Sequence, residues 1–309
     1  MDLSILIPNH NRNVADLVGD LIRQGRDQLR SFEILVADDG SEPNATLGYE
    51  QLQAMPEVDI IFQYQNMGRS KTRNDLVKRA RYDWILFIDS DALVASDQFL
   101  KVYGNYQGSS DVLVGGIQYQ ASRPANEEYI LRWRYGREIE ERTAAWRNKN
   151  PYRSFSAFNF MVRKSVFDRV QFQEEWDGYG HEDTLFGMAL GAHGFDILHI
   201  HNPLLHDGLE PGHEFLRKTD EGLRNLVRLE RTMDDSLPLK KYIRLLYVHD
   251  TLQKLHALAW VRIGYHILKG LLMRNLLGRN PDIRGFQFYK LARFHQLRKD
   301  PEQIKTGVV

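Results

Sequence analysis

The sequence predicts an α/β fold followed by a helical C-terminal region. Over the first 110 residues, short apolar runs typical of buried strands alternate with amphipathic stretches of helical periodicity. Polar and acidic residues gather where the apolar runs end. From Glu214 to Leu297 the periodicity is helical, with breaks at Pro238, Gly278 and Pro281. Such alternation indicates βαβ units and a parallel sheet covered by helices on both faces.

The N-terminal half contains four apolar runs that predict strands, at residues 3–7, 33–37, 60–64 and 84–88. Two stretches of helical periodicity lie among them, at residues 14–29 and 70–80. In the following half, strands are expected at 112–119, 158–162 and 195–200, and helices at 127–147 and 184–193. We therefore expect a domain over residues 1–210, with halves at 1–110 and 111–210, and a basic helical region over 211–309.

Composition excludes several kinds of chemistry. There is no cysteine, so disulfides, thiolate nucleophiles and cysteine-ligated metals are ruled out. The 41 basic and 41 acidic residues cancel, but residues 236–309 hold 14 Lys/Arg against four Asp/Glu. Either this basic segment binds an anionic partner, or its positive charge is attracted to the net negative charge of residues 1–235 within the fold. No signal peptide and no membrane-spanning run is predicted, and a cytoplasmic location is expected.

Asp89-Ser90-Asp91 follows the fourth predicted strand. Alternate residues at a strand end point the same way, so the two carboxylates can address one cation or one sugar. Two aspartates beside a turn can also be ordinary turn residues. Asp38-Asp39-Gly40 at the end of the second strand has the same ambiguity between a nucleotide ligand and a helix cap.

Three further segments carry candidate chemistry. Gly68 precedes a helix whose first turns hold several cations, including Arg73, a setting that favours phosphate. Glu182-Asp183 opens a helix, where a carboxylate is either a cap or a general base. His206, beyond the last strand, can reach a cation or be structural. A carboxylate with an imidazole suits Mn²⁺ or Mg²⁺ better than a structural zinc.

In chain order, these segments resemble family 2 glycosyltransferases of the GT-A fold. The resemblance rests on Ile5–Asn9, Ala37–Ser41, Asn66–Asn74, Asp89–Asp91, Gly180–Asp183 and His206. It covers residues 3–208, and residues 158–183 also look like the C-terminal part of galactosyltransferase and chondroitin-type synthase domains. It implies a Rossmann-like, nucleotide-binding mixed sheet flanked by helices, and inverting transfer from a nucleoside-diphosphate sugar.

The resemblance also implies roles for individual residues. Asp183 would be the catalytic base, and Glu182 would hold a hydroxyl beside it. The metal, Mn²⁺ or Mg²⁺, would be bound by Asp91 and His206. Apart from the resemblance, the position of Trp176 and Tyr179 just before Glu182 indicates that they stack on an acceptor sugar or simply pack in the core. The nucleotide sugar would contact Pro8, Asn9, Arg12, Asp38, Asp39, Gly68, Arg73, Asp89 and Ser90.

The expected donor is a UDP-hexose or UDP-N-acetylhexosamine, and the expected acceptor is a glycan or lipid-linked glycan in surface polysaccharide synthesis. No Gln-x-x-Arg-Trp motif of processive synthases follows Asp183, which favours single additions. The alternative is a non-catalytic nucleotide-sugar or glycan-binding module on the same scaffold, which would have no use for a base. No nucleic-acid partner is expected, because the body is acidic and no binding motif occurs.

The basic C-terminal helices suggest a place of action. Within residues 251–277, Lys254, Arg262 and Lys269 fall within about 80° of one another on a single helix. A basic amphipathic helix can lie on an anionic membrane surface, where a lipid-linked acceptor is found. This predicts peripheral contact with the inner face of the membrane. The alternative is a helical cap packed on the catalytic domain.

Overall fold

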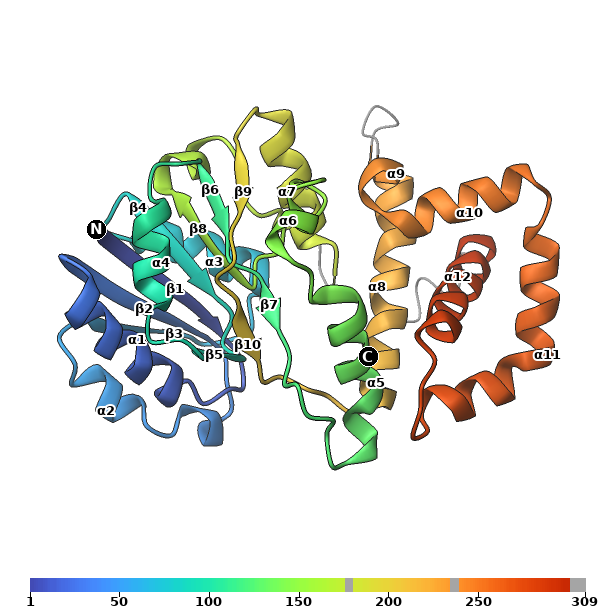
Figure 1. Cartoon of the computed structure of the whole chain (residues 1–309), viewed down its shortest axis with the longest axis horizontal. Coiled ribbons are helices and arrows are strands. Elements are labelled where there is room, and N and C mark those ends of the chain that lie inside the picture. Colours follow the sequence, from blue (N-terminus) through green and yellow to red (C-terminus); the bar gives the residue numbers. More distant parts are fainter. Residues whose placement is uncertain (176–179, 234–238, 301–309) are drawn as a thin grey trace. The chain divides into compact units, whose positions relative to one another are not determined.

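A computed structural model describes residues 1–175, 180–233 and 239–300. The contacts of the chain divide it into two compact units (Figure 1). The first contains Met1–Gln120, Glu141–Asp177 and Glu182–Gly208, and the second contains Ala121–Glu140, Gly178–His181 and Leu209–Val309. The expected limits at 1–210 and 211–309 stay a prediction.

A seven-stranded sheet forms the centre of the first unit, in the order β3-β2-β1-β4-β8-β6-β9. The first four of these strands are parallel, as the βαβ pattern predicts. Strand β8 runs antiparallel to both of its neighbours, so the sheet is mixed. The strands are β1 (Asp2–Asn9), β2 (Ser31–Asp39), β3 (Val58–Gln63), β4 (Trp84–Ile88), β6 (Val112–Val114), β8 (Asn159–Arg163) and β9 (Ile197–His199).

Helices cover both faces of this sheet because its strands are apolar on both sides. Along β1, Leu3, Ile5 and Ile7 point into a core with α1 (Ala15–Gln28) and α4 (Phe99–Tyr106). Leu6 points into the opposite core, which includes side chains of α3 (Arg69–Arg79) and α7 (Glu182–Ala192). The alternation follows from the two-residue period of a strand. The short α2 (Tyr49–Gln53) follows a 3₁₀ turn, η1 (Pro43–Thr46).

The strand expected over residues 112–119 is two strands, because two glycines interrupt it. A Cβ on Gly115 would stand 2.5 Å from Asn159 Nδ2, and Gly116 has a φ of +106°. The chain therefore leaves the large sheet after β6 and enters a three-stranded sheet of β5 (Ala92–Leu93), β10 (Leu204–His206) and β7 (Ile117–Gln118). This small sheet brings the segment after β4 beside the segment that contains His206.

The single helix expected over residues 127–147 is also wrong. It is divided into η2 (Glu127–Tyr129), α5 (Ile130–Tyr135), a π turn η3 (Gly136–Glu140) and α6 (Ala144–Arg147). Gly136 lies where the helix changes type, and Thr143 starts a new helix by accepting a hydrogen bond from the backbone N–H of Trp146 at 3.2 Å. The 3₁₀ turn η4 (Lys164–Asp168) follows β8.

The second unit is helical, as the sequence predicts. Its main elements are α8 (Gly212–Thr232), α9 (Leu239–Tyr242), α10 (Arg244–Lys254), α11 (Leu258–Leu276) and α12 (Ile283–Lys299). Helix α12 packs against both α8 and α11 (Figure 1). The core includes Phe215, Tyr265, Phe286 and Tyr289.

The stretch 251–277 is two helices rather than one. His256 has a φ of +55°, and the helix breaks between Lys254 and Leu258. Lys254 therefore does not share a helical face with Arg262 and Lys269, and the cationic stripe expected from the sequence is wrong. Within the described ranges, no helix is both long enough and apolar enough to cross a bilayer.

Candidate active site

The carboxyl ends of β1, β2 and β4 meet at one edge of the sheet. Asn9 stands opposite Asp38 in the parallel register of β1 and β2, and Asp89 directly follows β4. In sheets of this kind, ligands bind beyond the carboxyl ends of the strands. The structure thus gathers candidate residues that are up to 80 positions apart in the sequence.

A buried hydrogen-bond chain joins the first two strand ends. Asn9 Nδ2 donates to Tyr49 Oη at 2.6 Å, and Tyr49 Oη donates to Asp38 Oδ2 at 2.8 Å. Asp38 Oδ1 accepts from the backbone N–H of Ser41 at 2.9 Å, so this aspartate also holds its turn. Burial and the Asp38 carboxylate raise the pKa of Tyr49. Asn9 Oδ1 is buried with no partner in the described part of the chain, which leaves it available to a ligand.

Tyr49 was not anticipated, because it lies in a segment without a clear periodic pattern. Two other residues expected in the site are less enclosed: Pro8 is half-buried in β1, and the Arg12 side chain is exposed. The Arg12 carbonyl accepts a hydrogen bond from Asn9 Nδ2 at 2.8 Å, which fixes the turn after β1.

Asp39 anchors the loop that precedes α3. Its Oδ1 accepts from the backbone N–H of Met67 at 2.6 Å, and its Oδ2 accepts from that of Gly68 at 3.0 Å. Gly68 has a φ of +85°, a conformation that favours glycine. With both of its oxygens used in this way, Asp39 positions the start of α3 rather than offering a free carboxylate.

Arg73 is a buried cation on α3. Its Nη2 donates to Asp89 Oδ1 at 2.7 Å, and its guanidinium lies 5.2 Å from the centre of the Phe172 ring. The side chain is only 2% exposed. Nε and Nη1 have no hydrogen-bond partner among the described residues. Two buried donors of a permanent cation thus remain for an anionic group.

Asp183 lies in the first turn of α7. Its Oδ2 accepts from the backbone N–H of Ala157 at 2.9 Å, whereas its buried Oδ1 has no partner in the described ranges. Burial and the neighbouring Glu182 raise the pKa of Asp183 to about 6, although Arg73 opposes the shift. A carboxyl group of this kind is a suitable general base near neutral pH.

The turn before α7 is unusual in its backbone. Gly180 and His181 both have positive φ angles, of +96° and +78°. Glu182, the first residue of the helix, lies 3.6 Å from the Arg69 guanidinium. Trp176 and Tyr179, expected to contact the acceptor, lie outside the described residues.

Asp91 and His206 come together through the small sheet. Because His206 of β10 stands opposite Ala92 of β5, His206 Nε2 lies 3.5 Å from Asp91 Oδ2. The imidazole stacks on Tyr119 and Phe158, with ring centres 5.1 and 5.6 Å apart. Ser90, between the two aspartates, is half-buried.

Gly208 was also missed by sequence reasoning. A Cβ at this position would lie 2.3 Å from Asp91 Oδ2, so a larger residue would displace that side chain from its present position. The only sequence signal was its position two residues beyond His206. No group of three or more His, Asp or Glu side chains in the described ranges is arranged to hold a metal by itself. Asp91 and His206 offer one oxygen and one nitrogen, a pair that fits Mn²⁺ or Mg²⁺ when the remaining ligands come from a diphosphate.

This mixed sheet with helices on both faces is the GT-A fold of glycosyltransferases, as the sequence predicts. The family model for glycosyl transferase family 2 matches residues 4–170, more than half of the chain. The chain belongs to this family.

Several curated proteins are similar. Chondroitin synthase of Pasteurella multocida is 26% identical over 287 residues, which cover 81% of this chain and 28% of that protein. A poly(ribitol-phosphate) beta-glucosyltransferase of Bacillus spizizenii is 27% identical over 123 residues, 38% of this chain and 19% of that protein. The chain spans a third or less of the length of these relatives.

Solved structures share the fold at low identity. A mannosyltransferase from Pyrobaculum calidifontis, in complex with GDP-Man and Mn²⁺, has a TM-score of 0.60 at 12% identity, over 97% of this chain and 87% of the other. TarS from S. aureus in complex with UDP has a TM-score of 0.52 at 17% identity, over 98% of this chain and 92% of the other.

Proposed function

We propose that this protein is an inverting, metal-dependent glycosyltransferase that moves a sugar from a nucleoside diphosphate to a hydroxyl of a glycan or lipid-linked glycan. The observation that carries this proposal is Asp183, a carboxyl group with a raised pKa and a buried oxygen, Oδ1, that has no partner among the described residues. A non-catalytic binding module, the alternative, gains nothing from such a residue. Membership of family 2 and relatives that include chondroitin synthases support the same reaction.

In this proposal Asp183 accepts the proton of the acceptor hydroxyl, whose oxygen bonds to the anomeric carbon. The bond from that carbon to the diphosphate oxygen breaks on the opposite face, which inverts the configuration. Glu182 holds a sugar hydroxyl next to the base. The unpartnered donors of Arg73 attract the anionic donor, while its ion pair with Asp89 keeps that carboxylate oriented.

Asp91 and His206 would hold a divalent cation, Mn²⁺ or Mg²⁺. When bound, such a cation neutralises charge on the departing diphosphate. Asn9, Asp38 and Asp39, with Pro8, Arg12 and Gly68, would surround the nucleoside and the start of its diphosphate. Ser90 would lie beside the donor, and Trp176 and Tyr179 would contact the acceptor.

UDP is the proposed nucleotide, with a hexose or N-acetylhexosamine as the sugar. TarS, which shares the fold, has been solved with UDP and with UDP-GlcNAc, and this favours UDP. The GDP-Man bound by the mannosyltransferase makes GDP-mannose the competing donor to test. We also propose a lipid-linked acceptor in surface polysaccharide synthesis, reached by peripheral contact of the C-terminal helices with the inner, cytoplasmic face of the membrane.

The test is donor binding and nucleotide release over a panel of UDP- and GDP-sugars, with Mn²⁺ or with EDTA. Wild type should bind one donor in a metal-dependent manner and release its nucleotide. Asp183→Asn should keep donor binding but slow release by about 10²–10⁴-fold, the usual contribution of general base catalysis. Metal-dependent binding with equal release by both proteins would contradict the role of Asp183. No binding of any donor would favour a module that binds glycan alone.

A further inference from the structure

Helix α11 carries an apolar face that no described part of its own unit covers. Trp260, Ile267 and Leu271 are about 70% exposed, and Ile263 is 44% exposed. At 100° per residue these four side chains fall within about 80° of one another. The opposite face, with Leu258, Tyr265 and Leu276, is buried in the core of the helical unit. The exposed residues therefore form a continuous stripe, called here the α11 face, along most of the helix.

Four large apolar side chains in one stripe differ from the scattered exposed leucines of an ordinary surface. A contiguous patch of this kind marks a contact with a protein, a ligand or a membrane. Tryptophan at one end of the stripe is typical of a segment that lies in a membrane interface, where the ring is apolar and its N–H reaches water.

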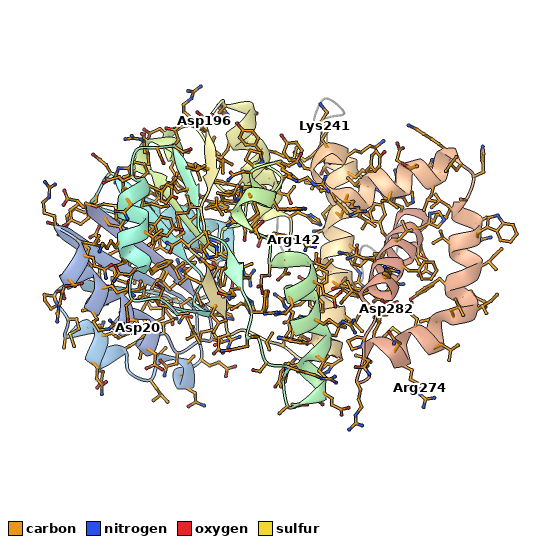
Figure 2. All side chains as sticks on the ribbon, in the orientation of Figure 1. Asp20, Arg142, Asp196, Lys241, Arg274 and Asp282 are labelled. Atoms are coloured by element: carbon orange, nitrogen blue, oxygen red, sulfur yellow. The ribbon has the colours of Figure 1, made fainter. Side chains whose placement is uncertain are left out.

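The charge around the α11 face favours an anionic surface as its partner. Residues 255–299 contain nine Lys/Arg and a single acidic residue, Asp282. In the described part of the chain, no carboxylate pairs with Arg262, Lys269 or Arg274. At 100° per residue, Arg262 and Lys269 lie on the side of α11 opposite this face. Arg274 falls within the arc of the α11 face, and Figure 2 shows it at the end of the helix, pointing outward. A second copy of the chain docked on this face would bring a second Arg274 into the same contact, which disfavours self-association through this face.

A polar cavity adjoins the start of α11. It has a volume of about 510 Å³, and its lining includes His249, His295, Arg298, Lys299 and Gln253. His249 Nε2 and His295 Nδ1 share a hydrogen bond of 3.1 Å, and Arg298 also pairs with Glu230 at 2.8 Å. Arg298 and Lys299, the two permanently charged side chains of the lining, can donate hydrogen bonds to a phosphate head group next to the apolar stripe.

We infer that the α11 face is the surface by which this protein binds an anionic phospholipid bilayer. The apolar side chains enter the interface, and Arg274 meets lipid phosphates. This inference rests on the membrane contact proposed above and gives it a location different from the cationic stripe that the sequence suggested. It does not depend on the chemistry of transfer.

The test uses the full chain and flotation with vesicles of phosphatidylcholine, with or without phosphatidylglycerol. Wild type should float with the anionic vesicles, and more weakly in high salt or with phosphatidylcholine alone. Ile267→Asp/Leu271→Asp should weaken binding by about 100-fold or more, since each buried apolar side chain contributes about tenfold or more. Arg274→Glu should reduce the preference for anionic vesicles. Leu47→Asp, which changes an equally exposed leucine of the first unit, is the matched control.

Tryptophan fluorescence gives a second readout. The chain has five tryptophans, so the signal of Trp260 is the difference between wild type and Trp260→Phe. With anionic vesicles that difference signal should shift to the blue and be quenched by brominated lipid.

Equal flotation of wild type and Ile267→Asp/Leu271→Asp would overturn the inference, as would no flotation at all. A dimer in solution that the double variant converts to a monomer, without any effect on flotation, would instead identify a second copy as the partner. Nucleotide release is measured on the same samples without vesicles. Nucleotide release by a protein that does not float with vesicles would reject only the membrane-binding surface. Flotation of a protein that releases no nucleotide would reject only the proposed transferase activity.

Discussion

At the scale of single residues, the proposed chemistry depends on the balance of charge around Asp183. Loss of solvent and repulsion from Glu182 favour its protonated form, while Arg73 and the Ala157 N–H favour the carboxylate. The result is a pKa of about 6, low enough for the base to be ionised at neutral pH and high enough to accept a proton readily.

The pH profile of transfer should therefore show an acid limb near pH 6. Below it, kcat/KM should fall about tenfold per pH unit as Asp183 becomes protonated. Arg73→Met keeps an unbranched side chain beside Phe172 but removes the charge, so the limb should move to higher pH. Arg69→Gln, which removes an exposed cation near Glu182, is the control and should move it less. An acid limb at the same pH in all three proteins would contradict the assignment of the base.

The same ionisation has a consequence for stability. The pKa of Asp183 is higher in the folded state than its ordinary value of 3.8, so its burial opposes folding most above pH 6 and not at all below pH 3.8. At pH 7.5, Asp183→Asn should raise the free energy of unfolding by about 1–3 kcal/mol. The gain should shrink as the pH falls through 6. Thermal unfolding of wild type and Asp183→Asn at a series of pH values measures this gain. A variant that is less stable than wild type at pH 7.5 would contradict the prediction and show that favourable contacts hold the carboxylate.

At the scale of the element, α7 is positioned by close backbone contact. A Cβ on Gly187 would lie 2.4 Å from the Tyr152 carbonyl oxygen, so the helix that carries Glu182 and Asp183 cannot approach as closely with a larger residue. Gly187→Ala should destabilise the protein by about 1–3 kcal/mol and slow transfer. In α1, Gly19→Ala meets nothing within 4 Å and should stabilise by up to about 1 kcal/mol. Chemical denaturation measures the free energy of unfolding of both variants. Equal changes in the two variants would mean that α7 can shift to accommodate the added methyl group.

The sequence predicts elements best where local periodicity and packing agree. The strands β1, β2 and β4 were expected from their apolar runs, since both faces of these strands are buried. The break at Gly115 and Gly116 was missed because it depends on Asn159 and Arg147, distant residues that occupy the space of two Cβ atoms. The break between α10 and α11 leaves no clear mark in the apolar pattern, and it moves Lys254 off the face that the sequence assigned to it.

Residues of the candidate site, too, are predicted best where a regular structural pattern places them. Residues at strand ends, such as Asn9, Asp38 and Asp89, are predictable because the topology of a parallel sheet gathers them. Tyr49 and Gly208 act through contacts with residues 11 and 117 positions away, and no local pattern indicates either contact.

At the scale of the whole molecule, the two units have separate apolar cores. The cores on either side of the sheet contain residues of the first unit, and the core of Phe215, Phe286 and Tyr289 belongs to the second. All the residues proposed to bind nucleotide and metal belong to the first unit. A ligand that binds only folded protein stabilises the part that it contacts.

Calorimetry of the full chain should therefore show two unfolding transitions, and UDP with Mn²⁺ should raise only one of them. At a ligand concentration 100 times its Kd the gain is about 2.7 kcal/mol. EDTA should abolish the gain, as should Asp91→Ala. Phe286→Ala, which opens a cavity in the helical unit, should lower the other transition and leave the ligand-sensitive one in place, because loss of a buried phenylalanine costs about 3–5 kcal/mol. If the nucleotide raised the transition that Phe286→Ala lowers, the nucleotide site would have to involve the helical unit, and the assignment of donor binding to the strand ends would fail.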